Sequence, residues 1–206
     1  MATNSAASHL DAEELLQLAI RASEANRHEE ALSFLKRAIE QAPNDGKLYY
    51  MLGAEHAQIG LYDRAAEEMA KAVQLAPELH TAHFQLGLLH LTSGRVPQAE
   101  AAWKPLDTLG ADHPLYVFKT GLLHLVRDEF EECAKHLKRG IALNTANPAL
   151  NNDMQRVLGD VEKRLGVPTA PPAEAATPTP LKKKVSQPAH TLLSAYRDNR
   201  TEDKDQ

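Results

Sequence analysis

Residues 46–79 read GKLYYMLGAEHAQIGLYDRAAEEMAKAVQLAPEL. This stretch holds two short amphipathic segments, one on each side of Gly60, and in both the apolar residues follow the period of an α-helix. Its residues recur at a spacing of 34: Leu52-Gly53 returns as Leu86-Gly87, and one repeat position holds Ala31, Ala65, Ala99 and Cys133. A fixed period of this length indicates stacked supersecondary units, because each unit needs its neighbours to bury its apolar face.

The predicted turn inside each unit repeats in the same phase. One repeat position holds Asn26, Gly60, Gly94 and Asp128. These residue types tolerate the left-handed backbone conformation in which many helices end. The pattern therefore predicts helix–turn–helix units with turns at these four positions, and no strand between residues 12 and 165.

The repeated residues resemble the tetratricopeptide repeat, which has a Leu-Gly pair in its first helix, Ala-x3-large-x2-Ala in its second helix, and a closing proline. The best copy has Leu52-Gly53, Ala65, Met69, Ala72 and Pro77. The resemblance covers about residues 12–147. It implies an all-α fold, a helical solenoid of about four helix pairs plus a capping helix.

The repeat phase sets the expected boundaries. We expect a flexible N-terminus (1–11), a solenoid (12–165) with repeats at 12–45, 46–79, 80–113 and 114–147 and a capping helix at 148–165, and a tail (166–206). Six of the twelve prolines lie in residues 166–190, which predicts a disordered tail with a short amphipathic segment at 190–200. Pro105 falls inside the second helix of its repeat and predicts a kink or an early helix end.

Composition excludes several classes of protein. No apolar run approaches the roughly 20 residues that cross a bilayer, and the N-terminus has no signal-peptide pattern, so we expect a cytoplasmic protein without an integral membrane segment. Cys133 is the only cysteine, and we expect it to be a buried packing residue. The net charge is −6 through Leu165 and +1 beyond it, and neither part is basic enough to predict nucleic-acid binding.

The ten histidines raise the question of a metal site. His56, His90 and His124 share one repeat position, where the family usually has tyrosine. Packed helices lie about 8–10 Å apart, whereas zinc needs nitrogen ligands at about 2 Å, so we expect structural histidines that each keep one hydrogen bond. The sequence has no catalytic or phosphate-binding motif. We therefore expect no enzyme activity, no cofactor and no metal.

A second row of residues on the first helices is turned about 100° from the residues that pack within each repeat. In the tetratricopeptide family, the equivalent face lines a concave groove that binds peptides. We call this row the apolar stripe; it consists of Tyr50, Ala54, Ala57, Phe84, Leu88, Leu91, Phe118, Leu122 and Leu125. The alternative is that the stripe only packs between repeats. It lacks the lysine and asparagine with which some family members clamp the C-terminal carboxylate of heat-shock chaperones.

The function that the resemblance implies is a non-catalytic protein-interaction scaffold, with an apolar helix or extended peptide in the groove. The alternative is a small secretion-type chaperone that masks an apolar segment of a client protein. The tail contains Leu192, Leu193 and Tyr196, which share one face of a short helix. We expect this face either to dock in the groove of the same chain or a neighbour, or to stay solvated as a motif that faces a membrane or another partner.

Overall fold

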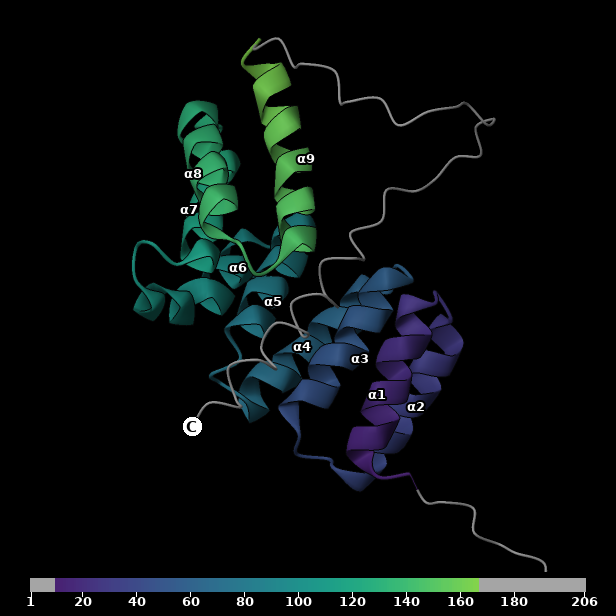
Figure 1. The fold of residues 1–206 in the computed structure, drawn as a ribbon. Coiled ribbons are helices and arrows are strands. Elements are labelled where there is room, and N and C mark those ends of the chain that lie inside the picture. Colours follow the sequence, from purple (N-terminus) through teal and green to yellow (C-terminus); the bar gives the residue numbers. More distant parts are fainter. Residues whose placement is uncertain (1–9, 167–206) are drawn as a thin grey trace, which may run out of the picture. The chain divides into compact units, whose positions relative to one another are not determined.

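A computed structural model describes residues 10–166 of the chain (Figure 1). Every regular element in this range is a helix, which confirms the predicted all-α class. None of the helices in residues 10–166 is long and apolar enough to span a lipid bilayer. Residues 1–9 and 167–206, including the predicted segment 190–200, lie outside the described range. The chain divides into two compact units at Leu79/His80, which is the predicted boundary between the second and third repeats.

The first unit contains two helix hairpins. Its helices are α1 (Ala12–Glu24), α2 (His28–Gln41), α3 (Gly46–Gln58) and α4 (Tyr62–Leu75). Helix α1 pairs with α2 and α3 pairs with α4, while α2 also packs against α3 and so joins the two hairpins (Figure 1). Leucines and methionines fill the core, among them Leu15, Leu35, Met51 and Met69, which are all fully buried.

The second unit contains two hairpins and a final helix. Its elements are α5 (His80–Thr92), α6 (Val96–Trp103), the 3-10 helix η1 (Lys104–Leu109), α7 (Pro114–Val126), α8 (Phe130–Leu143) and α9 (Pro148–Arg164). Helix α5 pairs with α6, α7 pairs with α8, and α9 lies along α8 (Figure 1). The aromatic side chains of Phe84, Trp103 and Phe118 form the centre of its core.

The turns inside the four hairpins have the predicted backbone conformation. The φ angles of Asn26, Gly60, Gly94 and Asp128 are 56°, 83°, 73° and 58°. In each hairpin the left-handed residue lets the chain reverse within three residues between the two helices. The prediction of four turns in phase is therefore confirmed.

Pro105 ends a helix early, as predicted. Helix α6 stops at Trp103, and the Lys104 N–H donates a hydrogen bond to the Ala101 carbonyl oxygen. In a continued α-helix the N–H of residue 105 would donate to this oxygen, but proline has no N–H. The chain continues as η1. A buried lysine from α7 supports this irregular turn: Lys119 Nζ lies 3.4 Å from the Trp103 carbonyl oxygen and forms an ion pair with Asp107.

Candidate peptide-binding surface

The Leu-Gly pairs and small residues allow the two helices of each hairpin to approach closely. In the α3–α4 hairpin, a Cβ at Gly53 would lie 3.0 Å from the Ala65 carbonyl oxygen and 3.1 Å from Met69 Cγ. The residues expected to pack here are all buried, namely Leu52, Gly53, Ala65, Met69 and Ala72. The predicted burial of these five residues between the helices of the best copy is thus confirmed.

Trp103 replaces the usual large aliphatic residue in the α5–α6 hairpin. Its indole stacks on Phe84 with the ring centroids 6.0 Å apart, and its Nε1–H donates a hydrogen bond to the Phe84 carbonyl oxygen at 2.9 Å. The indole lies where a Cβ of residue 87 would be, so the contact requires Gly87. This arrangement places a rigid aromatic pair beneath the surface of α5.

The two aromatic residues of the apolar stripe in the second unit lie side by side. The Phe84 and Phe118 rings are 6.4 Å apart and tilted by 53°, and both side chains are at most 1% exposed. Phe118 also packs against α8, where a Cβ at Gly140 would lie 2.5 Å from its ring. With Leu122, which is 2% exposed, these side chains are part of the core rather than of the accessible surface.

The accessible part of the stripe lies at the ends of α5 and α7. Leu88, Leu91 and Leu125 are half-buried and pack against the edge of the aromatic core. Leu88 and Leu91 follow Phe84 by about one and two helical turns, and Leu125 follows Phe118 by about two. Three leucines that pack against rigid aromatic rings thus form the accessible part of the apolar stripe in this unit.

The stripe residues of α3 have no comparable exposure. Tyr50, Ala54 and Ala57 are between 0% and 2% exposed. A polar cluster that sequence reasoning missed lies beside them, around the fully buried carboxylate of Glu55. Ser23 Oγ donates to Glu55 Oε1, and His28 Nδ1 lies 3.0 Å from Glu55 Oε2.

The Glu55 cluster joins α1, α2 and α3, since Ser23 and His28 belong to the first repeat and Glu55 to the second. A departure from the repeat is the signal that could have identified it. The same repeat position holds Leu89 and Leu123 in the later repeats, so a carboxylate there breaks the apolar pattern. A buried carboxylate needs hydrogen-bond partners, and the preceding repeat supplies them.

Two of the three repeated histidines bond to a carboxylate of their own hairpin. His56 Nδ1 lies 2.5 Å from Glu68 Oε2, and His124 Nδ1 bonds to Glu129. Burial raises the pKa of Glu68, although the hydrogen bond and charge of His56 act in the opposite direction. These two histidines are structural, as expected.

His90 departs from this pattern. Its Nδ1 has no hydrogen-bond partner among residues 10–166. Burial, assisted by the charge of Arg95, lowers the pKa of His90. Within the described part of the chain, no group of three or more histidine, cysteine, aspartate or glutamate side chains is arranged to hold a metal ion.

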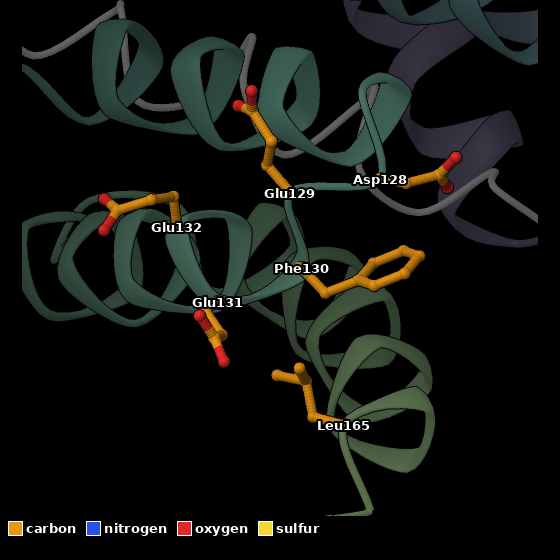
Figure 2. Close-up of a pocket in the computed structure, with 6 residues that line it drawn as sticks. All are labelled: Asp128, Glu129, Phe130, Glu131, Glu132 and Leu165. Atoms are coloured by element: carbon orange, nitrogen blue, oxygen red, sulfur yellow. The ribbon is translucent and has the colours of Figure 1, made fainter.

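A separate hollow of about 390 Å³ lies between the start of α8 and the end of α9. Phe130 and Leu165 provide its apolar walls, and both are half-buried. Figure 2 shows both side chains beside the start of α8, where the acidic side chains of the segment 128–132 point in different directions. This hollow was not predictable from the sequence, because it forms where the ends of two helices meet.

Comparisons with known proteins agree with this architecture. The tetratricopeptide repeat family model matches residues 16–80 and 50–112. A search of the curated proteins found no match. Several solved structures have a similar fold at identities of 18–20%.

A MamA fragment from Desulfovibrio magneticus matches with a TM-score of 0.57 and 20% identity, over 76% of this chain and 86% of that chain. A thermophilic TPR protein of Thermus thermophilus matches with a TM-score of 0.63 and 18% identity, over 76% and 84%. YrrB, described as a TPR protein with an unusual peptide-binding site, matches with a TM-score of 0.55 and 18% identity, over 78% and 80%. The repeat period, the paired helices with left-handed turns and the family match together show that the chain belongs to the tetratricopeptide repeat family.

Proposed function

We propose that this chain is a protein-interaction scaffold that binds an apolar helix or extended peptide along α5 and α7. The observation that carries the proposal is the row of half-buried leucines, Leu88, Leu91 and Leu125, at the edge of an aromatic core. The structurally similar YrrB is described as having a peptide-binding site, which supports the same class of function for this fold.

The physical basis of binding is burial of apolar surface on a rigid support. Removing apolar area from water contributes about 25 cal/mol per Å², so a partner with two or three apolar side chains gains from covering the leucines. Phe84 and Phe118 lie beneath them with fixed ring contacts. A preformed surface loses little conformational entropy on binding. We therefore expect this surface to bind its partner without a change in its own fold.

The tail of the chain is a candidate competitor for this surface. Leu192, Leu193 and Tyr196 lie outside the described residues, and their sequence has the spacing of a small apolar helix face. The segment 166–190, extended at about 3.1 Å per residue, has a contour length comparable to the size of a domain. We propose that docking of this tail face reduces the affinity for other partners.

Selection from a random peptide library tests the scaffold function. We expect the full chain to enrich peptides with two or three apolar residues at helical or alternating spacing. Leu91→Glu with Leu125→Glu should abolish binding of the enriched peptides. Leu143→Glu with Val126→Glu is the matched control, because these residues are 38% and 39% exposed and lie outside the stripe.

Binding that survives the Leu91→Glu/Leu125→Glu change, with helicity retained by circular dichroism, would refute the proposed surface. Tail docking has a separate test. Deleting residues 186–206 should strengthen the binding of an enriched peptide if the tail competes for the surface. An unchanged affinity would remove tail docking and leave the scaffold function intact.

A further inference from the structure

The hollow between α8 and α9 is an apolar site whose lining residues differ from those of the proposed peptide surface. Phe130 is the first residue of α8 and Leu165 caps the end of α9. Each packs against the core on one side and lines the hollow on the other (Figure 2). A space of about 390 Å³ between them exceeds the room that one or two ordered waters occupy, so it fits one or two apolar side chains.

The rim of the hollow is acidic. Asp128, Glu129, Glu131 and Glu132 all line it. Glu129 bonds to His124 and Glu132 lies 3.2 Å from Lys135 Nζ, whereas Asp128 and Glu131 form no ion pair with residues 10–166. The site therefore retains negative charge that a basic ligand would offset.

The site already accommodates one cation. The Arg164 guanidinium lies 5.3 Å from the centroid of the Phe130 ring, within the range of a cation–π interaction. This contact covers part of the Phe130 ring and leaves the ring half-buried. A ligand that combines apolar and basic side chains therefore matches both the walls and the rim.

The chain itself supplies such a ligand 16 residues after Leu165 in the sequence. Residues 181–185 read LKKKV, three lysines between two apolar residues, and this is the only cluster of three consecutive basic residues in the chain. The tail begins directly after Leu165, which is a wall of the hollow. Fourteen residues separate Gly166 from Leu181. At about 3.1 Å each, their contour length is about 43 Å, which is long enough for a loop that brings Leu181 back to the hollow.

We propose that the hollow binds residues 181–185 of the same chain. Leu181 and Val185 cover Phe130 and Leu165, and the lysine ammonium groups face the carboxylates of the segment 128–132. A short tether holds its ends at an effective concentration that reaches millimolar, so individually weak contacts are sufficient. Binding of Val185 at the hollow would fix the chain seven residues before Leu192. It would therefore limit the distance from the hollow that residues 192–206 can reach.

Paramagnetic relaxation measures this contact in the full chain. Cys133→Ala removes the natural thiol, and alanine holds the same repeat position in the other three repeats. Ser186→Cys then carries a nitroxide beside the proposed segment. We expect the amide signals of residues 128–132 and 161–165 to lose most of their intensity, and those of α1 and α2 to remain unchanged.

Two charge changes test the cause of the contact. Lys182→Glu, Lys183→Glu and Lys184→Glu together should restore the intensities, and Glu131→Lys with Glu132→Lys should do the same. Glu29→Lys with Glu30→Lys is the matched control, because these glutamates occupy the equivalent positions in the first turn of α2 and belong to the other compact unit. Because exposed charges are screened by salt, the intensity loss should also diminish at high ionic strength.

Three outcomes would overturn the proposal. The first is equal broadening in the chain with the wild-type tail and in the chain with the triple glutamate tail, since the three substituted lysines lie outside the described residues. The second is broadening centred on α5 and α7 instead of the hollow. The third is full broadening when isotope-labelled chains without the nitroxide are mixed with unlabelled chains that carry it, which would assign the contact to a second copy.

Discussion

Gly87→Ala isolates the close contact between α5 and Trp103. The added methyl would overlap the indole at Nε1, Cδ1 and Cε2, which are rigid ring atoms. Trp103 is 1% exposed and is held by its hydrogen bond to the Phe84 carbonyl. The ring therefore cannot yield without losing that bond or displacing α5.

Opposing effects decide the sign of the stability change. Alanine in place of glycine inside a helix stabilises by about 0.5–1 kcal/mol. Overpacking a dense core costs about 1–3 kcal/mol, and loss of the indole hydrogen bond costs about 1 kcal/mol more. We expect a net loss of about 1–3 kcal/mol in the free energy of unfolding.

Gly159→Ala is the matched control for Gly87→Ala. Gly159 lies in α9, and a Cβ there would meet nothing within 4 Å. Only the helix-propensity term remains, so this variant should gain about 0.5–1 kcal/mol. The same chemical change should thus have opposite signs at the two positions.

Urea denaturation followed by far-ultraviolet circular dichroism measures both variants. Trp103→Phe removes the indole atoms that the methyl meets, so Gly87→Ala should cost less in that background than in the wild type. Stabilisation by Gly87→Ala equal to that by Gly159→Ala would refute the packing argument. Strict additivity of the Gly87→Ala and Trp103→Phe effects would do so as well.

Three further predictions concern single side chains. Ala72→Leu should lower the free energy of unfolding by about 1–3 kcal/mol through overpacking, since Ala72 is 0% exposed, and an unchanged melting temperature would contradict the assigned repeat phase. Burial raises the pKa of Glu68 above 4.5, so the folded state binds this proton more tightly than the unfolded state. The stabilisation from protonated Glu68 is therefore complete below pH 4.5 and is lost as the pH rises through the folded-state pKa. Equilibrium unfolding at a series of pH values should show that Glu68→Gln removes this pH dependence of the free energy of unfolding. Burial raises the pKa of Cys133 from 9.0 to about 11, so a thiol-specific disulfide reagent should modify it at pH 8 only in denaturant, and rapid labelling of the folded protein would contradict its burial.

The parts of the fold that were predictable from the sequence depend on local chemistry. The left-handed conformation at the end of a helix favours glycine, asparagine and aspartate. Asn26 and Asp128 therefore predicted turns as clearly as Gly60 and Gly94 did. Pro105 acts on its own helix, and its effect was therefore predictable as well. The 34-residue period supplied the pairing of helices because each hairpin repeats the same packing positions.

The exposure of the apolar stripe was not predictable in the same way. Whether Phe118 lies on a surface or in a core depends on Gly140, which is 22 residues away on the facing helix. The stripe pattern contains no information about that partner. The Glu55 cluster and the hollow beside Phe130 are also products of contacts between helices, and no single helix contains all of their residues.

The two glycine–aromatic contacts have a consequence for building new proteins from these repeats. The α5–α6 hairpin places its bulky residue, Trp103, on the second helix and its gap, Gly87, on the first, whereas the α7–α8 hairpin places Phe118 on the first helix and Gly140 on the second. A consensus obtained by averaging the repeats would separate each bulky residue from its gap. The unit that can be exchanged or duplicated without repacking is therefore the whole hairpin, and chimaeras joined inside a hairpin inherit either a clash or a void.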